Sequence, residues 1–171
     1  MENLPKLIKI MYLEKFKARF AELQHLFPYK LLPCREEQIY SLERQYGLIL
    51  PMAYKEFLLW GGVCAGGLLQ GSNGSYDDLS ELREGAEELL ERNEFPEPLP
   101  KDAFVFLMHQ GYVFWFFTAS EGDDPPVYGY NEGGAGVPYA PVPFKKLSSS
   151  LSKFLEELLE QEAGIAKRLQ E

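Results

Sequence analysis

Residues 39–62, IYSLERQYGLILPMAYKEFLLWGG, decide the fold of this chain. Apolar residues recur at helical spacing up to Tyr46, and Gly47 follows at the position where helices commonly end in a left-handed residue. Pro51 suits the first turn of a second helix, because the N–H that proline lacks has no partner in that turn. The stretch therefore predicts two helices joined by a tight turn, with the second helix ending at the glycines of positions 61–62.

The joint spacing of these residues resembles the opening signature of the SUKH superfamily, which includes the Smi/Knr-type regulators of fungal cell-wall synthesis. The matching positions are Glu43, Tyr46, Gly47, Leu50, Pro51, Tyr54, Phe57, Leu58, Gly61 and Gly62. Trp60 departs from the asparagine that often precedes the glycine pair in that family. The resemblance implies a single α+β domain, with a central, mainly antiparallel sheet packed against helices.

A helical extension is predicted in front of this domain. Residues 1–30 form the extension and residues 31–171 the SUKH-like domain. Apolar residues from Leu4 to Phe27 follow one helical face, and the lysines lie mostly off it. Such a basic amphipathic segment can contact a partner protein or a membrane surface, into which it does not stably insert. Alternatively, it packs on the domain and its lysines face water. The large apolar side chains favour packing.

The charge of the 171-residue chain is unevenly distributed. The net charge is -9, yet residues 1–35 hold seven basic and three acidic side chains, whereas residues 77–97 hold nine acidic and two basic ones. A negative field repels phosphate backbones and attracts cationic proteins. We therefore expect a basic partner protein and no direct binding of nucleic acid. Alternatively, the negative charge serves only to keep the protein soluble.

Cysteine and histidine usage gives no sign of a metal site. Cys34 and Cys64 are the only cysteines, and with two histidines at unrelated spacing neither a metal nor a cofactor is expected. No apolar run reaches membrane-spanning length, and residues 1–16 lack the small-residue cleavage site of a signal peptide. Two reduced thiols in a cytoplasmic protein are the prediction.

The middle of the chain predicts a loop and an acidic helix. Residues 71–75, GSNGS, have the composition of a loop, and the aspartates that follow disfavour a phosphate site. Asp77 or Asp78 can cap a helix over residues 79–90. The outward glutamates of this helix form either a solvated face or a docking face for a basic partner.

Residues 103–118, AFVFLMHQGYVFWFFT, give the strongest strand signal. Two apolar runs flank a turn sequence, so a hairpin is expected at the centre of the sheet, with both faces at least partly covered. A further strand is predicted at residues 127–132, after an acidic turn with two prolines, and a last amphipathic helix at residues 147–159.

A candidate partner-binding surface lies around this acidic turn and the tyrosine-bearing strand. Exposed aromatic side chains beside acidic ones are typical of protein-binding surfaces. The candidates are Asp123, Asp124, Tyr128, Tyr130 and Glu132, with Asp77 and Asp78 adjoining. Ordinary strand packing is an equally good interpretation of the two tyrosines.

The resemblance implies a function as well as a fold. Bacterial SUKH proteins are largely regarded as immunity proteins that bind and neutralise toxins, many of them nucleases. We therefore expect a non-catalytic protein that binds a basic toxin domain. The alternative is a regulatory or scaffold module of the Smi/Knr type that binds endogenous partners. An enzyme is disfavoured, because Cys64 lies among small apolar residues that disfavour a thiolate, and no coherent set of nucleophile, base and oxyanion donors is seen.

Overall fold

The computed structural model describes residues 12–132 and 144–171. The helices are α1 (Glu14–Leu23), α2 (Glu36–Tyr46), α3 (Met52–Gly61), α4 (Tyr76–Arg92) and α5 (Leu151–Leu169), with short 3-10 turns η1 (Gln24–Leu26) and η2 (Ala119–Glu121). The strands are β1 (Leu31–Leu32), β2 (Cys64–Ala65), β3 (Ser72–Asn73), β4 (Ala103–His109), β5 (Val113–Thr118), β6 (Val127–Asn131) and β7 (Lys145–Ser148).

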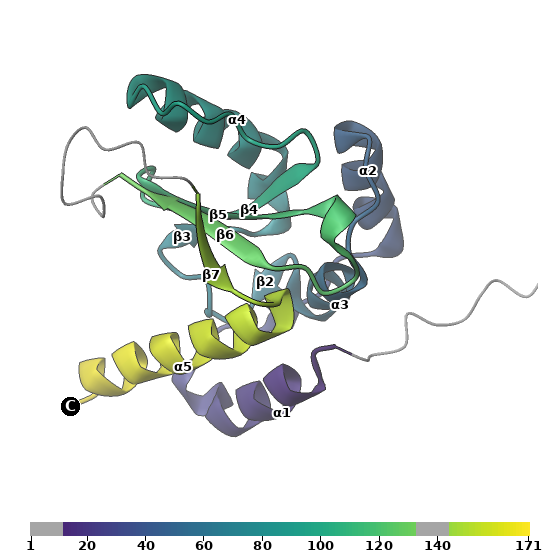
Figure 1. Cartoon of the computed structure of the whole chain (residues 1–171). Helices are drawn as coiled ribbons and strands as arrows, with labels where there is room; N and C mark the ends of the chain where they lie inside the picture. Colours follow the sequence, from purple (N-terminus) through teal and green to yellow (C-terminus); the bar gives the residue numbers. More distant parts are fainter. Residues whose placement is uncertain (1–11, 133–143) are drawn as a thin grey trace, which may run out of the picture.

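The expected α+β architecture is confirmed. The main sheet is antiparallel, with the order β3-β4-β5-β6-β7, and β1 pairs with β2 separately. Figure 1 shows α4 on one side of the main sheet and α1, α3 and α5 on the other. The strongest strand signal of the sequence, the β4–β5 hairpin, therefore forms the buried middle of three layers.

The predicted turn between α2 and α3 is confirmed. Gly47 ends α2 in the left-handed conformation, with φ 62°, and its N–H donates to the Glu43 carbonyl oxygen. Pro51 directly precedes the first residue of α3. Tyr54, which is 1% exposed, then packs on Phe104 of the central hairpin, at a ring distance of 5.4 Å. The two helices are thus fixed to the sheet by the stripe that the sequence indicates.

The central hairpin is covered on both faces, as predicted. Phe106 and Phe117 stack on one face at 5.5 Å, whereas Phe114 and Phe116 are buried on the other. Gln110 and Gly111 turn the chain with φ values of 49° and 75°. This left-handed sense matches the natural twist of the strands it joins.

The first helix is shorter than its predicted apolar stripe and packs on the rest of the molecule. Phe16 and Phe20 of α1 are buried and meet the edge of Trp60 at ring distances of 5.0 and 4.8 Å. Arg19 pairs with Glu160 of α5 at 2.6 Å. The positions Leu4, Ile8 and Met11 of the stripe lie outside the described residues.

Three local predictions are corrected. The 71–75 segment is not only loop, because residues 72–73 form β3 at the edge of the sheet. Ser75, not Asp77 or Asp78, is the N-cap of α4, and Asp78 completes its capping box from the third helical position. The last helix begins at Leu151 and not at residue 147, because residues 145–148 pair with β6 as β7.

Candidate protein-binding surface

The structure places the predicted site residues at three separate positions. Asp77 lies in the first turn of α4. Asp123 and Asp124 precede β6, and Glu132 follows it. Because an extended chain rises about 3.3 Å per residue, the two ends of this segment lie on the order of 25 Å apart. The seven residues therefore do not form one continuous patch.

Two of the predicted carboxylates hold the starts of helices. Asp124 accepts hydrogen bonds from the Ser152 N–H, at 2.9 Å, and from the Ser152 hydroxyl, at 2.6 Å, in the first turn of α5. Asp78 accepts from the N–H groups of Gly74 and Ser75 at 3.0 and 3.2 Å. These bonds satisfy backbone donors at helix starts, so both side chains have structural partners within the chain.

The two predicted tyrosines are half-buried and packed on the sheet. Tyr128 stacks on Phe116 at 5.5 Å, and its hydroxyl donates to Glu121 at 2.8 Å. This hydrogen bond to a carboxylate raises the pKa of Tyr128. Tyr130 stacks on Phe114 at 5.6 Å. Strand packing therefore accounts for one face of each ring.

Three carboxylates gather where β5 turns into β6, at the exposed residues Glu121 and Asp123 and at the half-buried Asp102 before β4, and we call them the acidic corner. The Asp102 carboxylate accepts from the Ser120 N–H at 2.9 Å, and hydrogen bonding to Ser120 lowers the pKa of Asp102. The carbonyl oxygen of Asp123 accepts from the Ala53 N–H at 2.9 Å. The corner is thereby held against the start of α3.

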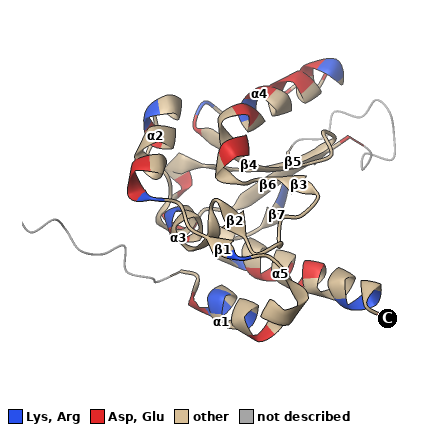
Figure 2. Cartoon of the chain, turned by 180° about the vertical axis from the view of Figure 1, so that it is seen from behind, with Lys and Arg blue, Asp and Glu red and all other residues tan. Residues whose placement is uncertain are grey.

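A second acidic surface follows α4. Its exposed glutamates are Glu81, Glu84, Glu87, Glu88 and Glu91, which we call the α4 acidic face, and Figure 2 shows red segments along this helix. Glu87 pairs with Arg83 at 2.9 Å. Glu132 lies 4.0 Å from Arg92 at the end of the helix, so Glu132 adjoins this face and not the acidic corner.

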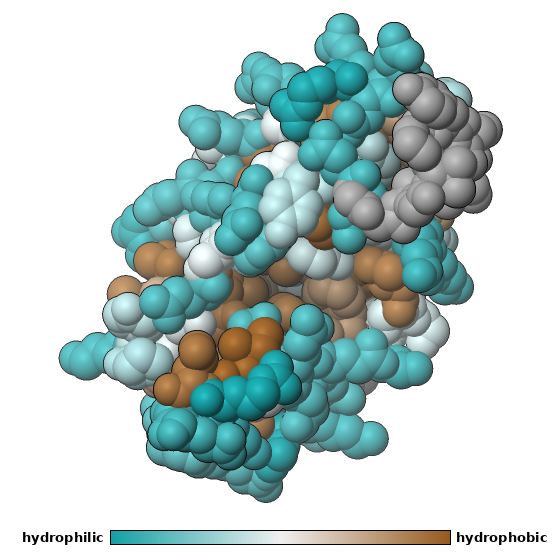
Figure 3. All heavy atoms as spheres, turned by 90° about the vertical axis from the view of Figure 1, so that its left-hand side faces the viewer, coloured by the Kyte–Doolittle hydropathy of each residue, from teal (hydrophilic) through white to brown (hydrophobic). Residues whose placement is uncertain are grey.

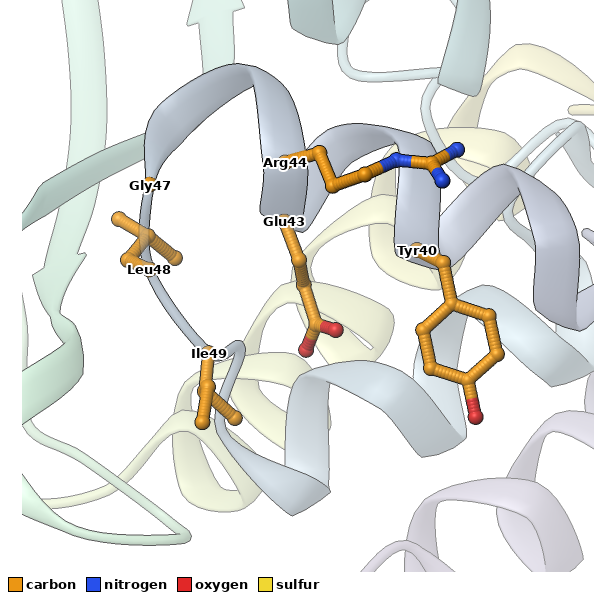
Figure 4. A pocket seen from close by; sticks show the side chains of 6 residues that line it. All are labelled: Tyr40, Glu43, Arg44, Gly47, Leu48 and Ile49. Atoms are coloured by element: carbon orange, nitrogen blue, oxygen red, sulfur yellow. The ribbon is translucent and has the colours of Figure 1, made fainter.

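A hollow beside the turn from α2 to α3 was not predicted. Its volume is about 400 Å³, and it is lined by Tyr40, Glu43, Arg44, Gly47, Leu48 and Ile49 (Figure 4). Ile49 is 76% exposed and Tyr40 56% exposed. The sequence held one clue, since an isoleucine between a helix-ending glycine and a proline has no place in a buried helical stripe. We call these six residues the α2 hollow.

Glu43 fixes the loop that forms the α2 hollow. Its carboxylate accepts from the Leu50 N–H at 2.9 Å and pairs with Lys55 at 2.8 Å. Both charged side chains are largely buried, at 13% and 15% exposure, so solvent screens this pair less than a surface pair. The loop is therefore held from both helices.

Comparison with known families assigns the chain. Residues 33–157 match the SMI1 / KNR4 family (SUKH-1). The chain belongs to this family. The SUKH-1 match contains Glu43 and the whole of the main sheet, whereas α1 and the last part of α5 lie outside it. A comparison with curated proteins gives no match.

Three side chains of this SUKH-1 chain that have potential chemistry, those of Ser72, His109 and Cys34, are bonded or buried within the fold. Ser72 and His109 face each other across β3 and β4, with the hydroxyl oxygen 2.8 Å from Nδ1. Burial raises the pKa of the Cys34 thiol to about 11, with Asp77 contributing. Among the described residues, no group of three or more His, Cys, Asp or Glu is placed to hold a metal ion. In the same residues, no helix has the length and apolarity that crossing a membrane requires.

Proposed function

We propose that this SUKH-1 protein is a non-catalytic immunity protein, which binds and neutralises a basic toxin domain through its acidic surface. The observation that carries the proposal is the acidic corner. Asp123 is exposed and its carboxylate has no ion-pair partner in the described part of the chain, while Glu121 lies two residues away. A cationic partner is attracted to such a surface and gains charge pairs on docking.

The α4 acidic face supports the same partner chemistry. The net charge of -9 and the glutamates along one exposed helix produce a field that attracts cations before contact. Such steering raises the association rate and weakens with salt, whereas contacts at the docking site govern dissociation. We therefore assign the contact to the acidic corner and long-range attraction to α4.

The test begins by sequencing the genes that flank this chain's gene and expressing each basic toxin domain that they encode. The affinity of such a domain for the protein is measured by calorimetry at about 50 and about 300 mM salt, between which the Debye length shortens about 2.5-fold. The variant Asp123→Lys is expected to weaken binding at low salt by about tenfold. Asp124 is left unchanged, because its carboxylate holds the start of α5.

The matched control is Glu14→Lys, which makes the same charge reversal at another exposed residue, in the first turn of α1. We expect it to change the affinity less than Asp123→Lys does. An affinity that ignores salt and survives Asp123→Lys contradicts the proposed surface. Binding of endogenous proteins, without rescue of toxin-poisoned cells by co-expression, would instead favour a regulatory module of the Smi/Knr type.

A further inference from the structure

The α2 hollow combines exposed apolar side chains with a rigid backbone. Ile49, at 76% exposure, lies two residues after Gly47 and two before Pro51. The N–H groups of Gly47 and Leu48 both donate to the Glu43 carbonyl oxygen. Because the loop is already ordered, a partner that docks on Ile49 loses little free energy to ordering it.

Opposite charges flank this apolar surface. The Arg44 side chain has neither an ion pair nor a hydrogen bond within residues 12–132 and 144–171, and Figure 4 shows it directed away from Ile49, on the Tyr40 side. Asp123 lies against the start of α3, close after Ile49 in the chain, through its carbonyl bond to Ala53. The Arg44 cation therefore flanks the Tyr40 end of the hollow, and the backbone of the exposed residue Asp123 is held beyond the Ile49 end, at the start of α3.

The shape of the hollow favours a protein as its occupant. Small-molecule sites enclose most of their ligand. Here the lining residues all come from one helix and the loop after it (Figure 4), so they do not enclose a ligand. Anchors of protein interfaces are large side chains that become desolvated when the two proteins pack together, and a polar rim surrounds them.

We infer that the α2 hollow is the apolar anchor site for the partner protein. The inference rests on the proposed function and specifies the segment that docks. This segment carries an apolar side chain that packs between Tyr40 and Ile49, a lysine or arginine that reaches Asp123, and an aspartate or glutamate that pairs with Arg44. The charge order gives the segment one orientation along the hollow.

The experiment selects peptides and then maps where they bind. A phage-displayed library of random 12-residue peptides is selected on the intact protein, and the enriched sequences are synthesised. We expect them to share an apolar residue with a basic residue on one side and an acidic residue on the other. Their affinity should fall about tenfold on Ile49→Asp, the loss typical of an anchor residue.

Leu169→Asp is the matched control, because Leu169 is equally apolar and 82% exposed at the end of α5. Figure 3 shows further apolar surface among hydrophilic residues on one side of the molecule. A peptide attracted by exposed apolar surface in general would therefore also respond to the control. The inference requires that Leu169→Asp leaves the affinity unchanged. Circular dichroism and the melting temperature establish that both variants fold.

Several outcomes overturn the inference. The inference fails if no peptide is enriched, or if the enriched peptides lack the charge order. It also fails if Ile49→Asp and Leu169→Asp weaken peptide binding equally. If the intact protein self-associates and Ile49→Asp abolishes this, a second copy of the chain is the occupant. If Ile49→Asp binds peptides normally while Asp123→Lys still weakens the basic toxin domain, the anchor site fails and the proposed function stands. If peptides dock as expected but no basic toxin domain binds, the proposed function fails and the anchor site stands.

Discussion

Replacing Glu56 by glutamine tests how the first helix is held to the domain. The Glu56 side chain is 1% exposed in α3. Its two carboxylate oxygens accept from the N–H groups of Tyr12, at 2.9 Å, and Leu13, at 3.1 Å. Lys17 lies 3.9 Å from the same carboxylate. The buried Glu56 carboxylate therefore accepts hydrogen bonds from two backbone N–H groups at the start of α1, although Glu56 lies more than forty residues later in the sequence.

The expected loss follows from these contacts. Glutamine keeps one acceptor oxygen but turns an N–H₂ group toward a backbone donor, so one charged hydrogen bond is lost and one buried donor is left unsatisfied. Each effect costs about 1–3 kcal/mol, and because both arise partly from the same broken hydrogen bond, we expect the free energy of unfolding to fall by about 2–4 kcal/mol. The Lys17 pair adds less than about 1 kcal/mol. For a chain of this size the melting temperature should fall by roughly 4–16 °C.

Urea unfolding followed by circular dichroism measures the loss, and hydrogen exchange of the α1 amides shows where it acts. The control is Glu157→Gln, which removes an exposed carboxylate from a helical pair with Lys153 and should cost less than about 0.5 kcal/mol. A loss below about 1 kcal/mol for Glu56→Gln, or unchanged protection of α1, would refute the assignment of Glu56 as the residue that holds this helix.

The remaining predictions concern buried groups. Because burial raises the Cys34 pKa to about 11, fewer than about one in a thousand of these thiols is ionised at pH 7.5, and mass spectrometry should find Cys34 unalkylated until urea is added. Burial also raises the pKa of Glu162, so the stability that its protonated form contributes is lost as the pH rises through that pKa. Thermal unfolding should therefore show that Glu162→Gln raises the free energy of unfolding by a few tenths of a kcal/mol at pH 7 and leaves it unchanged at pH 3. A Cβ at Gly62 would lie 2.7 Å from the Leu58 carbonyl oxygen, so Gly62→Ala should cost about 1–3 kcal/mol in urea unfolding. Gly164→Ala, inside α5 where nothing lies within 4 Å of the added carbon, should instead stabilise the protein by about 0.5–1 kcal/mol.

The sequence predicted those elements whose causes are local. Gly47 ends its helix through its own backbone freedom, and the β4–β5 hairpin follows from two apolar runs around a turn. β7 was missed because Lys145–Ser148 is a polar strand in which only the last residue is buried. It forms by pairing with β6, and no alternation of apolar residues marks such an edge strand.

The candidate surface was predicted less well, because the role of a carboxylate depends on partners distant in sequence. Asp123 and Asp124 are neighbours, yet one is exposed and the other is bonded to Ser152, 28 residues later. The clustering of acids along the chain also implied a single patch, whereas a strand of five residues separates Asp124 from Glu132. The α2 hollow arises from a helix and the loop that returns past it, which no periodicity in the sequence describes.

The contact between α1 and α5 has a consequence for the order in which the protein folds during synthesis. Arg19 and Glu160 are 141 residues apart, and the ribosome adds about 5–20 residues per second, so α1 waits roughly 7–28 s for its partner helix to be made. Throughout that time the aromatic side chains of α1 lack part of their final cover. Newly made chains should therefore depend on chaperones that shield apolar helices, and moving α1 behind α5 by circular permutation should shorten that dependence.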